Sequence, residues 1–254
     1  MKFQHYFSWL LPILCLLTGP LHVAGGKERN AQKGDYVIVI HGLGWLRDTL
    51  KPTVKHLTEE GYETVRFSYD SRKPLNVISL NQGLDELIKT NCPDPKRRIH
   101  FVAHSMGCIV TRSYLDARQP KNLGQVVLIA PPNQGTELAD LVGKSKILKE
   151  VFGKGAPDLG TSPDSLPNRL PPPSYKPGVI MGDRSMFPPL SWMLKGPDDG
   201  VIRVERGKVA GMGGFVVVPA NHTRIPGARP ALEQMDCFLT TGAFSPPVTV
   251  PEKG

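Results

Sequence analysis

The stretch RIHFVAHSMGCIVTRSYL, Arg98–Leu115, determines how the rest of the chain is interpreted. It begins with an apolar run at 99–103, which is typical of a buried strand, and Met106–Leu115 then carries apolar residues at helical spacing. Between the two lies AHSMG at 103–107. A strand, a sharp turn centred on a serine and a helix form a nucleophile elbow, which holds the serine hydroxyl clear at the carboxyl edge of a sheet.

The residues around Ser105 suit such a turn. Ala103 and Gly107 are small, and larger side chains would clash where the helix passes close to the strand. The backbone N–H of Met106 opens the helix and has no partner within it, so we expect it to donate a hydrogen bond to an oxyanion. The usual pattern has glycine where this chain has Ala103, which adds one methyl group. The alternative interpretation is a buried serine in an ordinary strand-to-helix turn.

The length and hydrophobic content are enough for one sizeable α/β domain. The chain has 254 residues, 40% hydrophobic and 21% charged, with a formal net charge of +8. These values argue against bulk disorder, a collagen-like chain or a multi-span membrane protein. The basic residues are scattered and no nucleic-acid motif occurs, so no nucleic-acid partner is predicted. We interpret the charge as a solvated basic surface, and the alternative is weak peripheral attraction to an anionic membrane or to acidic glycans.

The first 26 residues have the pattern of a secretory signal peptide. Lys2 supplies a positive charge, 9–17 is apolar, and Gly19-Pro20 breaks the helix before small residues at 24–26. The apolar core is too short to span a bilayer comfortably. We therefore predict export to the periplasm or medium, with an uncleaved N-terminal membrane anchor as the alternative. Residues 27–254 are predicted to form a single domain that ends in a loose tail at about 244–254.

Strands and helices alternate along this domain. Apolar runs predict further strands at 36–40, 63–69, 125–130, 178–181 and 215–218, and periodic apolar residues predict helices at 48–60, 77–91, 137–141, 145–152 and 230–239. Such alternation predicts a mostly parallel sheet with helices on both faces. Residues 143–177 are rich in glycine and proline. We expect an irregular insertion near the active site there, either a small lid or pocket wall, or a surface loop without a catalytic part.

The loop after the first strand, HGLGW at 41–45, is the second candidate element. Glycines directly after a strand let the backbone approach a ligand closely. We expect Gly42 to serve this purpose and the N–H of Leu43 to point into the space above Ser105, where it would be the second oxyanion donor. His41 is interpreted as a support of this loop.

A serine hydroxyl needs a base to take its proton and a carboxylate to orient that base. In folds with this elbow the chain order is serine, acid, histidine, and His222 is the only histidine after Ser105. It follows the last predicted strand, so we assign it as the general base. The main candidates for the acid are Asp198 and Asp199, and Asp183 and Glu205 are lower-ranked candidates. The D-G turn at 199–200 favours Asp199.

These motifs together resemble those of bacterial α/β-hydrolases of the lipase and esterase superfamily, in particular the small lidless lipases and the related lipid deacylases. The resemblance covers most of 36–239 and departs from the family at 143–177, which is longer and richer in proline. The matching segments are AHSMG at 103–107, HGLGW at 41–45, PNQGTELAD at 132–140, DDGV at 198–201 and His222-Thr223.

The resemblance implies an α/β-hydrolase fold and cleavage of carboxylic acyl esters, lipid or short-chain, through an acyl-enzyme on Ser105 with His222 and Asp199. Leu43 and Met106 would hold the oxyanion. The same triad also serves other reactions, so the alternative functions are phospholipid or glycolipid deacylation, thioester hydrolysis and acyl transfer. The alternative that is not an enzyme is a catalytically silent envelope binding protein of this fold. No cofactor or metal is predicted, because this chemistry needs none and no metal-ligand spacing occurs. A monomer is assumed.

Overall fold

The computed structural model describes residues 34–185, 191 and 194–246. The predicted signal peptide at 1–26 and the end of the predicted tail lie outside the described residues. Within them, no helix is long and apolar enough to cross a bilayer.

Six parallel strands form one sheet in the order β2-β1-β3-β4-β5-β6. The chain passes from β1 to β2 on one side and from β3 to β4 on the other, so the connections that follow the neighbouring strands β1 and β3 run in opposite directions. Ligands of open parallel sheets bind at such a point. The strands are β1 (Tyr36–Ile40), β2 (Glu63–Phe67), β3 (Ile99–His104), β4 (Leu123–Ile129), β5 (Gly178–Gly182) and β6 (Gly214–Val218).

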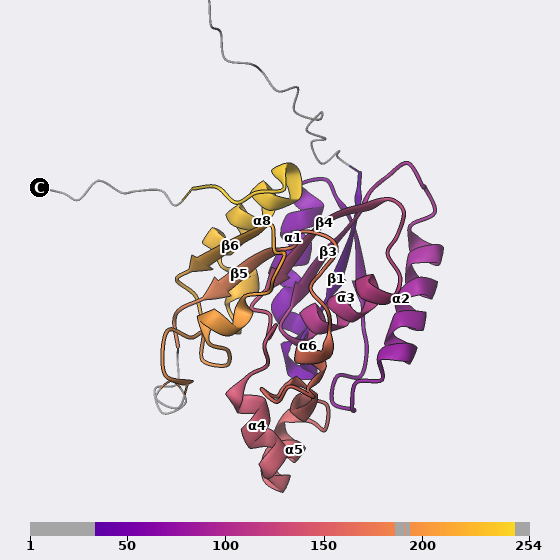
Figure 1. Ribbon diagram of the computed structural model, residues 1–254. Helices are drawn as coiled ribbons and strands as arrows, with labels where there is room; N and C mark the ends of the chain where they lie inside the picture. Colours follow the sequence, from indigo (N-terminus) through magenta and orange to yellow (C-terminus); the bar gives the residue numbers. More distant parts are fainter. Residues whose placement is uncertain (1–33, 186–190, 192–193, 247–254) are drawn as a thin grey trace, which may run out of the picture.

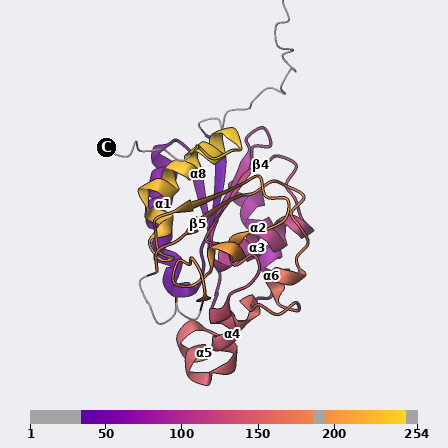
Figure 2. The same cartoon turned by 60° about the vertical axis from the view of Figure 1, so that its left-hand side comes forward.

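Helices cover both faces of the sheet (Figures 1 and 2). On one face α2 and α3 pack against the even-numbered side chains of β1, and on the other face α1 and α8 pack against its odd-numbered ones. The α-helices are α1 (Lys51–Glu59), α2 (Val77–Asn91), α3 (Met106–Ala117), α4 (Glu137–Lys144), α5 (Lys146–Phe152), α6 (Leu166–Arg169) and α8 (Arg229–Thr241). Short 3-10 helices are η1 (Gly44–Leu50), η2 (Ala156–Leu159), η3 (Val204–Gly207) and η4 (Ile225–Gly227).

The core follows from the apolar strands. All five residues of β1 and all six of β3 are buried, because both strands lie inside the sheet with helices on either side. Continuous apolar runs are what such doubly covered parallel strands require. The predicted parallel sheet with helices on both faces is therefore confirmed.

The helix predicted at 48–60 has a different form at its start. Residues Gly44–Leu50 are a 3-10 helix, and the α-helix begins only at Lys51. Pro52 explains the change, since its missing N–H and its ring are tolerated only in the first turn of an α-helix. The strand predicted at 63–69 likewise ends earlier, at Phe67.

The predicted insertion at 143–177 is more ordered than its composition suggested. It holds α5, η2 and α6, and its Pro-rich end is tied to α3 by Arg112, which is 4% exposed. The Arg112 guanidinium donates to the carbonyls of Pro167, Leu170 and Pro171 at 3.2–3.4 Å, and also to Asn133. Burial lowers the pKa of Arg112. All of these acceptors are uncharged, so hydrogen bonds to backbone and amide oxygens offset the desolvation of this cation.

Candidate active site

The turn between β3 and α3 has the backbone of an elbow. Ser105 has φ 55° and ψ −126°, a conformation that L-residues rarely adopt. The surrounding hydrogen bonds fix it there, because its N–H donates to the Ile129 carbonyl and its own carbonyl accepts from the N–H of Cys108, both at 2.9 Å. Such strained residues cost about 1–3 kcal/mol and persist where the surroundings over-determine them.

Two glycines allow the close packing that this turn needs. A Cβ atom on Gly107 would lie 2.5 Å from the carbonyl oxygen of His41 and 2.6 Å from that of Ile40, so α3 could not approach β1 with any other residue there. A Cβ atom on Gly42 would lie 2.9 Å from the Cβ of Ser105. The loop after β1 therefore runs directly beside Ser105.

The structure brings Ser105, His222 and Asp199 together from three separate parts of the chain. The Ser105 hydroxyl lies 2.9 Å from Nε2 of His222, and Nδ1 of His222 lies 2.7 Å from Oδ2 of Asp199. His222 and Asp199 are almost fully buried. In a neutral imidazole this arrangement leaves Nδ1–H donating to the carboxylate and Nε2 free to accept the serine proton.

The two adjacent aspartates face different partners. The second oxygen of the Asp199 carboxylate accepts the N–H groups of Val201 and Ile202 at 2.9 and 2.8 Å, which holds the first oxygen toward His222. Asp198 instead accepts from the Ser191 hydroxyl and from the N–H of Gly200. The structure thus places Asp199 against the imidazole and turns Asp198 away.

The other two acid candidates lie in ion pairs elsewhere. Asp183 faces the neighbouring Arg184 at 3.4 Å, and Glu205 pairs with Lys208 at 2.9 Å. Neither has a hydrogen bond to His222 among the contacts of the described residues.

The candidate oxyanion donors lie on either side of Ser105. Met106 is the first residue of α3, so its N–H has no acceptor within the helix. Leu43 immediately precedes η1, and its side chain packs in one apolar cluster with Met106. His41 lies behind the loop: its Nδ1 contacts the Gly42 carbonyl at 2.7 Å, and its ring stacks on Tyr69, whose hydroxyl donates to the His41 carbonyl.

His104 is the residue near this site that the sequence did not assign. It lies on the buried side of the elbow, where its Nε2 is 3.0 Å from the carbonyl oxygen of His222 and its ring is 4.9 Å from the His222 ring. Burial lowers its pKa well below the usual histidine value, and the neighbouring His222 adds to that effect. A neutral His104 with its proton on Nε2 therefore donates to the backbone of His222 and holds that loop against β3.

We expect His104→Phe to lower kcat of a reaction in which His222 takes the Ser105 proton about 3- to 10-fold with little change in KM, because the lost hydrogen bond positions His222 and makes no contact with substrate. Steady-state kinetics on a soluble ester would measure both constants. The matched control is His104→Gln, which keeps an N–H donor and should retain more of kcat. Equal losses in both variants, or a change confined to KM, would contradict this role.

Acid should destabilise the fold through the buried histidines. Burial lowers the pKa of both His100 and His104 below the unfolded value of about 6.5. Below that pH the unfolded chain binds more protons than the folded one, so the free energy of unfolding falls as pH falls, by up to about 1.4 kcal/mol per pH unit for each histidine. Urea unfolding followed from neutral pH to about pH 5 would measure the slope, which His104→Phe should reduce. A free energy that rises on acidification would refute the prediction.

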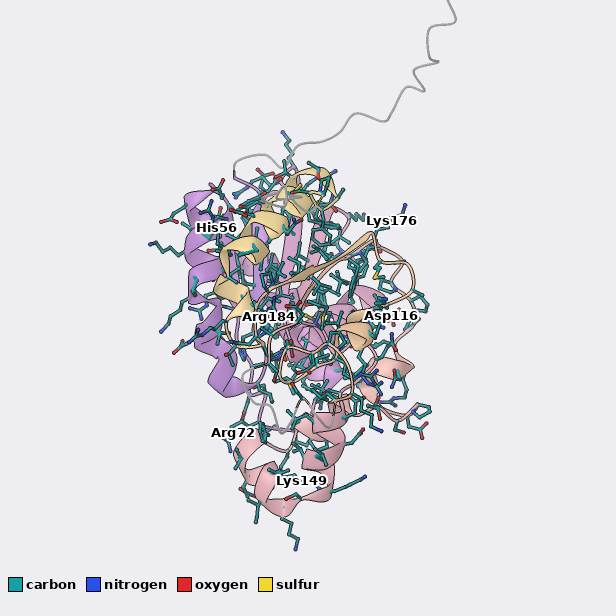
Figure 3. The ribbon with its side chains drawn as sticks, turned by 90° about the vertical axis from the view of Figure 1, so that its left-hand side faces the viewer. His56, Arg72, Asp116, Lys149, Lys176 and Arg184 are labelled. Atoms are coloured by element: carbon teal, nitrogen blue, oxygen red, sulfur yellow. The ribbon has the colours of Figure 1, made fainter. Side chains whose placement is uncertain are left out.

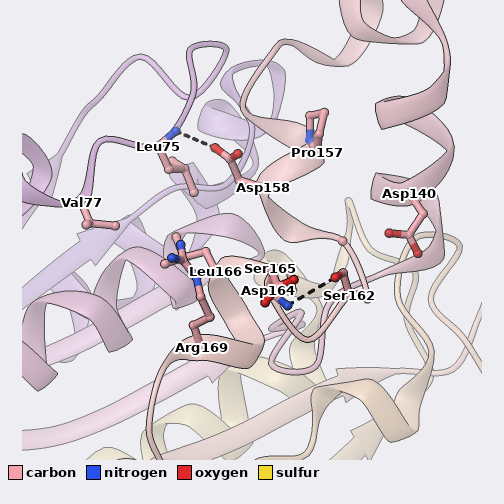
Figure 4. A pocket seen from close by; sticks show the side chains of 11 residues that line it. Leu75, Val77, Asp140, Pro157, Asp158, Ser162, Asp164, Ser165, Leu166 and Arg169 are labelled. Atoms are coloured by element: carbon pink, nitrogen blue, oxygen red, sulfur yellow. Dashed lines mark hydrogen bonds between the residues drawn. The ribbon is translucent and has the colours of Figure 1, made fainter.

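A cavity of about 370 Å³ lies under the insertion, between α2, η2 and α6 (Figure 4). Leu75 and Leu166 line it, and these side chains also pack against the apolar cluster that contains Met106. Its wall includes three aspartates, and Oδ2 of Asp158 accepts the N–H of Leu75 at 2.7 Å. Ser105 does not line this cavity, and the three aspartates in its wall suit a solvated recess better than an acyl chain.

Comparisons with known proteins agree with this architecture. A model of a family described as serine hydrolase matches residues 80–150, the segment that contains the elbow. No curated protein sequence matches the chain significantly.

Among solved structures, the chain is similar to the mature form of the Bacillus licheniformis lipase BlEst2, with a TM-score of 0.65, 14% identity, and coverage of 84% of this chain and 95% of the lipase. It is also similar to a metagenomic carboxyl esterase, with a TM-score of 0.58, 15% identity, and coverage of 76% and 66% of the two chains. A type II thioesterase of the yersiniabactin biosynthetic pathway, YbtT, has a TM-score of 0.53, 14% identity, and coverage of 84% and 95%. The predicted resemblance to α/β-hydrolases of the lipase and esterase type is confirmed, and at these identities it establishes the fold.

Proposed function

We propose that the chain is an exported serine hydrolase that cleaves carboxylic acyl esters through a Ser105–His222–Asp199 triad. The observation that carries the proposal is the unbroken series of hydrogen bonds from the Ser105 hydroxyl through His222 to the Asp199 carboxylate, at 2.9 and 2.7 Å. The strained elbow beneath Ser105 supports it independently, since such strain is retained at sites where geometry serves chemistry.

The reaction proceeds in two steps. His222 takes the proton of Ser105 as the hydroxyl oxygen attacks the ester carbonyl, while Asp199 keeps the imidazole in the tautomer that accepts at Nε2. The N–H groups of Leu43 and Met106 stabilise the oxyanion of the tetrahedral intermediate. His222 then protonates the leaving alcohol. Water attacks the carbonyl of the acyl-enzyme while His222 takes its proton, and His222 returns that proton to the Ser105 oxygen as the carboxylic acid is released.

Two further parts of the proposal concern the protein's surroundings. The pattern of residues 1–26 supports export, and the net charge of +8 supports weak peripheral contact with anionic membranes. An exported hydrolase with a basic surface would encounter acyl lipids as its substrates, alongside short-chain esters.

Hydrolysis of p-nitrophenyl esters from acetate to palmitate would test the function. We expect turnover on at least part of the series, and the dependence on acyl length would separate an esterase from a lipase. An acyl-thioester and a phospholipid assayed alongside would detect the other chemistries that the same triad supports. A folded protein without turnover on any of these substrates would favour the silent binding protein.

A further inference from the structure

Helices α4 and α5 form a pair that projects from the body of the molecule (Figures 1 and 2). Its inner helix, α4, buries Ala139 and Val142, whereas α5 has no fully buried residue. Figure 3 shows Lys149 on this projection and Arg72 near the place where it meets the body. The outer helix therefore turns most of its surface to solvent.

The outer helix exposes large apolar side chains. Ile147 is 77% exposed and Val151 is 57% exposed. They are four residues apart in α5 and so lie on one face of it. Single exposed apolar residues are common on protein surfaces, but an adjacent pair on a projecting helix forms a small apolar patch.

Lysines are concentrated on the same projection, and Lys146 is exposed next to Ile147. Four of them fall between residues 144 and 154, against a single acid, Glu150. None of the four forms a salt bridge with a carboxylate of the described residues. The lysines are Lys144, Lys146, Lys149 and Lys154. Apolar residues on one face with flanking lysines are the pattern of a helix that lies in the interface of an anionic bilayer.

The projection stands at the same edge of the sheet as Ser105. One end of it follows the carboxyl end of β4 through residues 130–136. The other end is bonded to the loop after β2. The N–H of Lys154 donates to the carbonyl of Arg72, and the Arg72 guanidinium donates to the carbonyl of Glu150, both at 2.6 Å. Because β1 and β3 lie between β2 and β4 in the sheet, the helix pair straddles the edge where Ser105 is held.

From this arrangement we infer that the exposed face of α5, Ile147 and Val151 with the exposed lysines Lys144, Lys146 and Lys154 of the projection, docks the protein on an anionic lipid bilayer. Docking would bring the edge that carries Ser105 toward the membrane. The inference deepens the proposed function by naming membrane-resident acyl lipids as the substrate class. Binding itself needs no catalysis, so the two proposals can fail separately.

Vesicle co-sedimentation with the full chain carrying Ser105→Ala would test the docking. We expect binding to vesicles of phosphatidylcholine with phosphatidylglycerol, weaker binding to phosphatidylcholine alone, and weakening by salt. Ile147→Asp should reduce binding about tenfold, and Lys146→Gln about fivefold. Both positions lie at the surface of α5, so folding should be preserved, as circular dichroism would verify.

The matched control is Ile78→Asp, which places the same charge at an isoleucine that is 69% exposed on α2. Loss of binding in Ile147→Asp but not in Ile78→Asp would support the docking face. Equal loss in both, or binding unaffected by Ile147→Asp, would overturn it. Self-association of the wild-type chain that Ile147→Asp abolishes, without any vesicle binding, would instead identify a second copy as the occupant.

A second readout uses the active enzyme. Ile147→Asp should leave kcat/KM on p-nitrophenyl acetate unchanged and lower turnover of vesicle-borne ester about tenfold. If the wild-type protein binds vesicles but hydrolyses neither substrate, the proposed function fails and the docking stands. If it hydrolyses the soluble ester and never binds vesicles, the docking fails and the proposed function stands.

Discussion

Ser105→Ala is expected to abolish ester hydrolysis, with kcat falling by about 10⁴- to 10⁶-fold. The physical reason is that the hydroxyl 2.9 Å from His222 Nε2 is the atom that would form the acyl-enzyme, and no other nucleophile takes its place. A burst-phase assay with a p-nitrophenyl ester would measure both the rate and the loss of the acyl intermediate.

Alanine at position 105 has the same steric strain at φ 55° as serine, so the substitution does not change the strain of the turn. Its thermal stability should therefore stay close to that of the parent, so that any loss of activity reports chemistry alone. Activity retained above one-hundredth of the parent's would mean that Ser105 is not the nucleophile.

Asp199→Asn is expected to lower kcat by about 10⁴-fold. The amide keeps the shape of the carboxylate, but it can present N–H to Nδ1 of His222 and stabilise the tautomer that cannot accept the serine proton. It also removes the negative charge that favours the imidazolium in the transition state. The pH–rate profile and kcat on a short-chain ester would measure the effect.

Asp198→Asn is the matched control for that change. This residue is adjacent in sequence and also buried, yet its carboxylate contacts Ser191 and Gly200 rather than His222. We expect at most about a tenfold loss of kcat, from disturbance of the turn. A larger effect in Asp198→Asn than in Asp199→Asn would reverse the assignment of the acid.

Much of the fold could be predicted because the strands near the site are buried on both faces. Their runs of apolar, often β-branched residues are typical of buried strands. The predicted and observed bounds of the strand Tyr36–Ile40 agree. The helix at Val77–Asn91 also agrees at both ends, since its apolar face is regular and Asn76 caps it. Where local signals conflicted, at Pro52, the boundary was wrong.

Some contacts could not be predicted from the sequence, because they join a side chain to the backbone carbonyl of a residue far away in the chain. His104 meets the carbonyl of His222 across 118 positions, and Arg112 meets the carbonyls of Pro167 and Leu170 across more than 50. Backbone acceptors leave no mark in a sequence, because every residue has one. The exposed face of α5 was missed for a similar reason, since which side of a short helix is covered depends on its neighbours.

The elbow has a consequence for protein engineering. Because Ser105 is held at φ 55°, the chain gives up about 1–3 kcal/mol of stability at the residue proposed to do the chemistry. Glycine reaches this conformation without that strain, so Ser105→Gly should raise the melting temperature while yielding an inert protein. A thermostability screen that ignores turnover would enrich this change. Activity must therefore be selected alongside heat resistance if the chain is to be improved as a catalyst.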